Sequence, residues 1–197
     1  LDCWAFAEVF QSLVEIKNKQ KFLWISIFPY DAIHLRKDWL AFLEPIDFPC
    51  VYSQYGYSML EGNVPNLYYF RPPLYDADKF ISYSCEKKEK IKHELFSGFT
   101  DNKFTFGFFG ANQFRKDPLR LIHAFFEVRK EFPDICLYLH MEMSGVFNID
   151  QYLRDYGCEI GTVIIKKQGL SYDTKSVVDA YNSIDCLINT SLQEGLS

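Results

Sequence analysis

Short apolar runs that end at prolines or polar turn residues recur in the first half of the chain. They occupy residues 22–28, 50–53 and 66–70. Pro29 follows the first directly, and Pro72 and Pro73 follow the third after Arg71. Proline cannot donate a ladder hydrogen bond, so it ends a central strand. The runs therefore predict three short buried strands. Residues 2–17 instead carry apolar side chains at helical spacing and predict an amphipathic helix.

After residue 102 apolar strand-like runs alternate with helical patterns. Strands joined in this way need crossover connections, which produces a parallel sheet with helices packed on it. Asp117 can cap the helix that begins at Pro118, where a missing N–H costs nothing. The predicted strands are 104–109, 135–140, 162–166 and 184–189, and the predicted helices are 118–131, 149–156 and 174–182.

A cluster of turn-forming residues at 98–102 is the best candidate for a linker between two domains. Residues 1–97, which include a polar helix at 85–96, then form a first domain, and residues 103–197 form a second. The expected fold class is α/β, with doubly wound parallel sheets in both domains. The chain opens on Leu1 and stops after a Glu-Gly pair and two further residues, so we expect both domains to be incomplete.

The composition and net charge make some classes of function less suitable than others. Hydrophobic residues make up 48% of the 197 positions and the net charge is −5, which favours a packed globular protein over a nucleic-acid surface. The lysines between 87 and 92 alternate with glutamates and fit a solvated helix face. No apolar run is long enough to span a bilayer and no signal peptide is visible, so we expect a cytoplasmic protein with at most peripheral membrane contact.

Six cysteines are dispersed along the chain and none forms a C-x-x-C pair. This spacing predicts neither a zinc site nor a redox motif. Cys136 and Cys186 lie in apolar runs, where a reduced thiol behaves as a small hydrophobic group. We expect reduced cysteines and no bound metal or cofactor.

Two loops at the carboxyl ends of predicted strands carry candidate chemistry. Gly110-Ala-Asn-Gln-Phe-Arg-Lys116 places two cations beside a helix N-terminus, where an anion such as a diphosphate is favoured. Asn189-Thr-Ser-Leu-Gln-Glu-Gly195 places a carboxylate beside backbone amides. Taken alone, each segment also fits an ordinary polar turn, and that interpretation is the simpler one.

Read together and in order, the segments of the second half resemble a known family. Residues 108–125, 132–140, 179–185, 187–191 and Glu194-Gly195 are similar to successive motifs of retaining GT-B-fold glycosyltransferases. This is the glycosyltransferase family 4-like group, also called glycosyl transferases group 1. The resemblance covers the C-terminal, donor-binding domain of that fold and ends at the approach to its paired glutamates.

The resemblance implies a role for each charged residue of the two loops. Lys116, with Arg115 beside it, would neutralise the diphosphate of a UDP- or GDP-linked sugar as it leaves. Glu194 corresponds to the first glutamate of the pair and would hold hydroxyls of the donor sugar. No metal would be required. The second glutamate falls beyond Ser197.

The resemblance also implies further donor contacts. They comprise backbone amides after the glutamate, a neutral hydrogen-bond donor where the family often has arginine, and a loop that borders the nucleotide base. These residues are Gly195, Leu196, Ser197, Asn112, Gln168 and Gly169.

In the first half, residues 28–31, 53–56 and 76–80 are similar to landmarks of the family's acceptor-side domain. The resemblance implies that residues 1–97 are the later part of this N-terminal domain. The glycine-rich loop expected near that domain's start is absent from the chain. The implied acceptor contacts are Tyr30, Asp31 and His34.

The expected activity is hexosyl transfer, with retention of configuration, to a carbohydrate, protein or lipid acceptor. A sugar-nucleotide epimerase of the same fold remains an alternative. So does a non-catalytic or degenerate GT-B-like binding protein. For His123 and His140 we expect structural roles.

Overall fold

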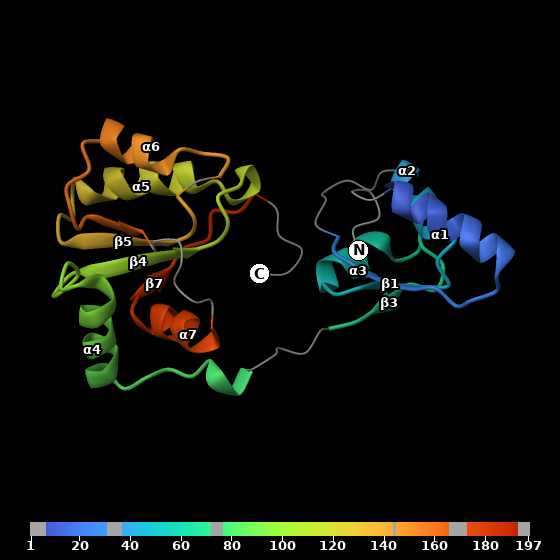
Figure 1. Cartoon of the computed structure of the whole chain (residues 1–197), viewed down its shortest axis with the longest axis horizontal. Coiled ribbons are helices and arrows are strands. Elements are labelled where there is room, and N and C mark those ends of the chain that lie inside the picture. The colour runs from blue at the N-terminus through green and yellow to red at the C-terminus, as the bar shows by residue number, and fades with distance from the viewer. Residues whose placement is uncertain (1–6, 31–36, 72–76, 144, 166–172, 193–197) are drawn as a thin grey trace. The chain divides into compact units, whose positions relative to one another are not determined.

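The computed structural model describes residues 7–30, 37–71, 77–143, 145–165 and 173–192. The chain divides after position 73 into two compact units (Figure 1). Within the described residues every strand pair is parallel, as expected for an α/β fold with crossover connections.

The first unit is a three-stranded sheet with the order β1-β2-β3, packed against helices. Phe10, Phe28, Val51 and Leu60 contribute to one core between the helices and one face of the sheet. Ile25 and Ile27 alternate with the buried strand residues and lie exposed on the opposite face. The elements are α1 (Ala7–Lys19), β1 (Ile25–Phe28), α2 (Lys37–Leu43), β2 (Phe48–Val51), α3 (Gln54–Leu60) and β3 (Tyr68–Tyr69).

Asp47 ties α1 to the first two strands. Its carboxylate accepts hydrogen bonds from Lys17 Nζ at 2.5 Å and from the Trp24 backbone N–H at 2.8 Å. The Lys17 hydrogen bond is the main cause that lowers the pKa of Asp47. The carboxylate therefore stays ionised and keeps the helix joined to the sheet.

Helices α2 and α3 were not predicted from the sequence. Helix α3 begins at Gln54, where the Ser53 side chain caps it by accepting a hydrogen bond from Gly56 N at 3.0 Å. A β-carbon at Gly56 would lie 3.1 Å from Tyr30 Cβ, so the glycine lets α3 approach β1 closely. The serine cap was the available signal.

The second unit is a four-stranded parallel sheet with the order β6-β5-β4-β7. Its elements lie within a few residues of the predicted bounds. Two short 3-10 helices, η1 and η2, were not predicted. The elements are η1 (Ala77–Lys79), α4 (Cys85–Phe96), β4 (Phe104–Phe109), η2 (Phe114–Lys116), α5 (Pro118–Arg129), β5 (Ile135–His140), α6 (Ile149–Asp155), β6 (Val163–Ile165), α7 (Thr174–Asn182) and β7 (Cys186–Leu187).

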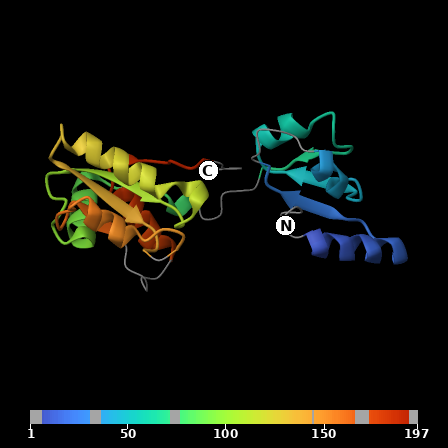
Figure 2. The same cartoon turned by 90° about the horizontal axis from the view of Figure 1, so that it is seen from above.

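Helices cover both faces of this second sheet. Figure 1 shows α5 and α6 on one face and α4 and α7 on the other, and Figure 2 looks onto the α5 and α6 side. Phe108, Ile122 and Leu139 lie in the core beneath α5 and α6. Phe96 and Tyr138 lie in the core on the other face. This arrangement confirms the doubly wound sheet predicted for the second half.

Helix α4 belongs to the second unit, although the sequence placed it in the first domain. The buried Lys92 side chain donates to Lys103 O and to an Asp185 carboxylate oxygen, both at 2.9 Å. Phe96 packs on Tyr138, with ring centroids 4.8 Å apart. The division of the chain therefore precedes α4, and the predicted linker at 98–102 lies inside the second unit.

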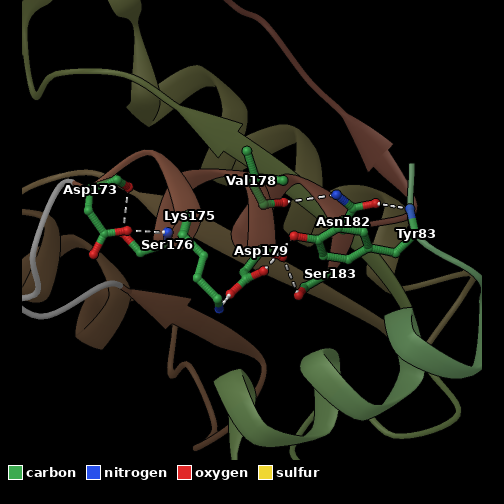
Figure 3. A network of polar contacts seen from close by, with 8 residues as sticks. All are labelled: Tyr83, Asp173, Lys175, Ser176, Val178, Asp179, Asn182 and Ser183. Atoms are coloured by element: carbon green, nitrogen blue, oxygen red, sulfur yellow. Dashed lines mark hydrogen bonds and ion pairs between the residues drawn. The ribbon is translucent and has the colours of Figure 1, made fainter. Parts of the chain in front are cut away.

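The segment that enters the second unit is bound to α7 (Figure 3). Tyr83 N donates to Asn182 Oδ1 at 2.9 Å, Asn182 Nδ2 donates to Ile81 O at 3.0 Å, and the Tyr83 hydroxyl donates to Asp179 at 3.0 Å. Burial, followed by the Asp179 hydrogen bond and charge, raises the pKa of Tyr83, which keeps this phenol protonated. Lys175 pairs with the other Asp179 oxygen at 2.6 Å.

The state of the cysteines and the lengths of the helices can be read from the described residues. The five cysteines of this part of the chain are all free thiols. No helix there combines the length and the apolar character that crossing a bilayer requires. The same residues contain no cluster of three or more His, Cys, Asp or Glu side chains that could hold a metal ion.

Candidate functional site

The sheet of the second unit has one topological switch point. The chain leaves β4 for β5 and β6 on one side and then returns to β7 on the other side of β4. In open parallel sheets, ligands bind beyond the carboxyl ends of the strands at such a point. The two candidate loops of the sequence follow β4 and β7, so the fold places the described part of each loop there.

The loop after β4 forms a basic turn, which we define as Phe114–Lys116. Arg115 is exposed and Lys116 is half-buried. A β-carbon at Gly110 would lie 3.5 Å from Lys116 Cδ and 3.1 Å from the Phe108 ring. A larger residue at Gly110 would therefore crowd the Phe108 ring, which explains the glycine directly after this strand.

Hydrogen bonds join the basic turn to the loop after β7. Thr190 Oγ1 donates to Lys116 O at 2.9 Å and approaches Asp117 O at 3.2 Å. Leu192 N donates to Arg115 O at 2.7 Å. The backbone of the second loop thus lies against the two cations up to two positions before Glu194.

Asp117 modifies the electrostatics of the turn. Its side chain caps α5 by accepting from Arg120 N at 3.3 Å, and its other carboxylate oxygen pairs with Arg120 Nε at 2.8 Å. Pro118 at the first helical position has no N–H to offer a ligand. The start of α5 is already occupied by a carboxylate, so any anion at this turn depends mainly on Arg115 and Lys116.

Asn112 lies at the same loop but is buried, with 6% of its surface exposed. Its amide nitrogen donates to Phe147 O at 2.8 Å, and its amide oxygen accepts from Phe147 N at 3.0 Å. The side chain is thus bonded to the loop after β5. Its predicted contact with a sugar nucleotide stays a prediction.

Aromatic side chains gather at the carboxyl ends of β4 and β5. Phe109 stacks on Tyr181 at 4.0 Å between ring centroids and on His140 at 4.8 Å. His140 Nδ1 also lies 2.8 Å from the Tyr138 hydroxyl. Away from this cluster, His123 Nδ1 lies 2.5 Å from the Tyr156 hydroxyl. Each histidine thus has a hydrogen-bond partner within the protein. Burial raises the pKa of Tyr181.

The first unit does not present Tyr30 as an acceptor contact. This side chain is 1% exposed, lies in the core and makes an edge contact with Trp39 at 6.4 Å between ring centroids. The apolar alternation of β1 continues through residue 30, which turns the ring toward the helices. The remaining predicted site residues lie outside the described residues: Asp31, His34, Gln168, Gly169, Glu194, Gly195, Leu196 and Ser197.

Comparison with known proteins defines the class of fold. No protein-family profile and no curated protein sequence matches the chain. The crystal structure of TarM matches 91% of this chain and 34% of that one, at 16% identity and a TM-score of 0.63. The catalytic domain of starch synthase IV from Arabidopsis thaliana, bound to ADP and acarbose, matches 80% of this chain and 37% of that one, at 13% identity and a TM-score of 0.55.

A third structure, the C-terminal domain of a glycosyl transferase group 1 family protein (LpcC) from Francisella tularensis, matches 59% of each chain at 18% identity and a TM-score of 0.46. The chain spans 34% to 59% of the length of these structures. At these identities the likeness concerns the fold. The chain has the mixed α/β fold, with parallel sheets, of GT-B glycosyltransferases.

Proposed function

We propose that this chain is part of a glycosyltransferase that moves a hexosyl group from a UDP- or GDP-linked sugar to an acceptor with retention of configuration. The second unit would bind the donor. The acceptor would be a carbohydrate, a protein or a lipid. Lys116, Arg115 and Glu194 would act directly on the donor, with the amides of residues 195–197 beside them.

One observation carries this proposal. The hydrogen bonds from Thr190 Oγ1 to Lys116 O and from Leu192 N to Arg115 O join the two candidate loops at the switch point of the sheet. Taken alone in the sequence, each loop also fitted an ordinary polar turn. Two cations and the chain segment that leads to Glu194 lie at one edge of the sheet. This arrangement suits a sugar that carries a diphosphate.

In the proposed reaction the bond between the sugar's anomeric carbon and the diphosphate oxygen breaks, and its electron pair leaves with the diphosphate. Lys116 and Arg115 would offset that developing charge, because cations fixed before the reaction need no rearrangement during it. An acceptor hydroxyl would form the new bond to the anomeric carbon and pass its proton to the departing diphosphate oxygen. Glu194 would hold the sugar through its hydroxyls. We propose that no metal takes part.

Nucleotide binding to the full-length protein that contains this chain gives the first test. Isothermal titration with UDP and with GDP should show saturable binding of one of them. Binding of neither would favour the degenerate, non-catalytic alternative. Product analysis with a labelled nucleotide sugar distinguishes the epimerase alternative, which would yield a changed epimer, from a transferase, which would move label to an acceptor.

Substitutions at the two loops test the residues. In the protein that contains this chain, Lys116→Ala and Glu194→Ala should each reduce transfer roughly 100-fold or more, since each removes a contact to the reacting donor. Lys130→Ala is the matched control, because this lysine ends α5 far along the helix and pairs with Glu127 at 2.7 Å. Near-normal turnover in both loop variants would contradict the assignment.

A further inference from the structure

Asn112 pairs with the backbone of one residue in the neighbouring loop. Phe147 N donates to its Oδ1 at 3.0 Å, and its Nδ2 donates to Phe147 O at 2.8 Å. Longer contacts of Nδ2 reach Met143 O at 3.3 Å and Glu142 O at 3.4 Å. The side-chain amide therefore pairs with the loop after β5 as a neighbouring strand would, through one donor and one acceptor.

The contact is reinforced around the side chain. Val146 N donates to Asn112 O at 3.2 Å. A β-carbon at Gly145 would lie 2.7 Å from Asn112 Cβ and 2.8 Å from its carbonyl oxygen. Glycine is thus the residue that lets the two loops approach this closely. Phe114, in the basic turn, makes an edge contact with Phe147 at 5.0 Å between ring centroids.

The basic turn is therefore held from two sides. Thr190 and Leu192 bind its backbone from the loop after β7, whereas Asn112 and Phe114 join it to the loop after β5. Lys116 N also donates to the carbonyl oxygen of Gln113, the residue before the turn, at 3.1 Å. A backbone fixed in this way fixes the positions from which the cationic side chains extend.

We propose that Asn112 is a positioning residue that holds the Arg115–Lys116 turn in place for a diphosphate by clamping it to the loop after β5, in place of the direct donor contact expected from the sequence. This inference rests on the proposed function. An ordered turn binds an anion more tightly because less conformational entropy is lost on binding. Asparagine suits the position because its side-chain amide supplies both the acceptor for Phe147 N and the donor for Phe147 O.

The experiment measures the affinity of the 197-residue chain for inorganic pyrophosphate and UDP by isothermal titration. Asn112→Ala should weaken both about tenfold, since small displacements of binding groups cost this much or more. It should also speed hydrogen exchange at the amides of Val146 and Phe147. Gly145→Ala pushes a methyl group against the same side chain, so it should also weaken binding and speed hydrogen exchange. It replaces Asn112→Ala if that variant does not fold.

Asn148→Ala is the matched structural control. This asparagine caps α6 through Gln151 N at 3.1 Å, so its loss should lower the thermal midpoint without changing the affinity for pyrophosphate. In a Lys116→Ala background, Asn112→Ala should have little further effect on affinity, because both act through one turn.

Unchanged pyrophosphate affinity in Asn112→Ala and Gly145→Ala, or an equal loss in Asn148→Ala, would overturn the positioning role. If the unsubstituted chain binds neither pyrophosphate nor a nucleoside diphosphate, the proposed function fails and this role fails with it. The hydrogen-exchange measurement then shows separately whether the clamp itself exists.

Discussion

Asp117 shows how a single residue can join two elements at a site. It ends η2 and caps α5 while its backbone is left-handed, with φ 44° and ψ 54°. A side chain in this region costs roughly 1–2 kcal/mol, although aspartate tolerates it better than most. The cap to Arg120 N and the Thr190 hydroxyl near Asp117 O hold the residue there. Backbone strain of this kind is common at active sites and ligand-binding sites.

Replacing Asp117 by alanine should therefore destabilise the second unit by about 1–2 kcal/mol, because the cap is lost while the strain remains. Asp117→Asn, which keeps a side-chain oxygen and tolerates the left-handed region, should stay close to the parent protein. The free energy of unfolding from urea titration measures both. Equal stability of the alanine and asparagine variants would mean that the cap contributes little.

At the scale of elements, α4 is held to the sheet by a charge pair as well as by apolar packing. The Lys92 side chain is 8% exposed, and the Asp185 oxygen that it reaches also accepts Thr105 N at 2.8 Å. One carboxylate thus connects α4, the start of β4 and the start of β7. A buried pair of this kind gains little net energy, but the loss of one partner leaves the other unsatisfied.

Lys92→Met should lower the free energy of unfolding of the second unit by about 3 kcal/mol. This value is at the lower end of the cost of removing one partner from a buried ion pair, because Asp185 is partly exposed. Lys90→Met on the same helix is the control, since Lys90 is exposed and only 4.0 Å from Glu94. A loss in Lys92→Met no larger than in the control would show that apolar packing alone holds α4. Thermal and urea unfolding give both values.

At the scale of the whole molecule, the boundary between the units decides which segments fold together. The sequence placed it at 98–102, where turn formers gather, but the contacts place it after position 73. Residues 81–83 and α4 make their hydrogen bonds and apolar contacts with α7 and the second sheet. A turn-rich stretch is thus an internal corner of the second unit.

Fragments with different starting points test this boundary. A fragment of residues 77–197 should unfold cooperatively, whereas one of residues 103–197 should be less stable by at least about 4 kcal/mol, because Phe96 no longer covers Tyr138. A fragment of residues 84–197 retains α4 and isolates the contribution of the Tyr83 and Asn182 contacts. If residues 103–197 matched the longest fragment in stability, the boundary read from the sequence would be the better one.

Local physics made the elements of the second unit predictable. Helix α5 has its cap and its proline in adjacent positions, and the apolar runs of β4 and β5 are bounded by polar residues. Helix α2 was missed because its seven residues are too few for a helical period to be distinguished from a mixed apolar run. The basic turn and its family resemblance were also visible, since they depend on adjacent residues.

The sequence by itself determined the alternation of strands and helices, and with it the parallel α/β fold. It also determined which residues carry charge near the strand ends. Only the tertiary structure decided that Asn112 pairs with Phe147, that Lys92 reaches Asp185, and that Thr190 joins Lys116. These partners stand 35, 93 and 74 positions apart, where no local propensity acts. The folded chain selects them because buried polar groups must find partners, and the packing of the sheet determines which partners are within reach.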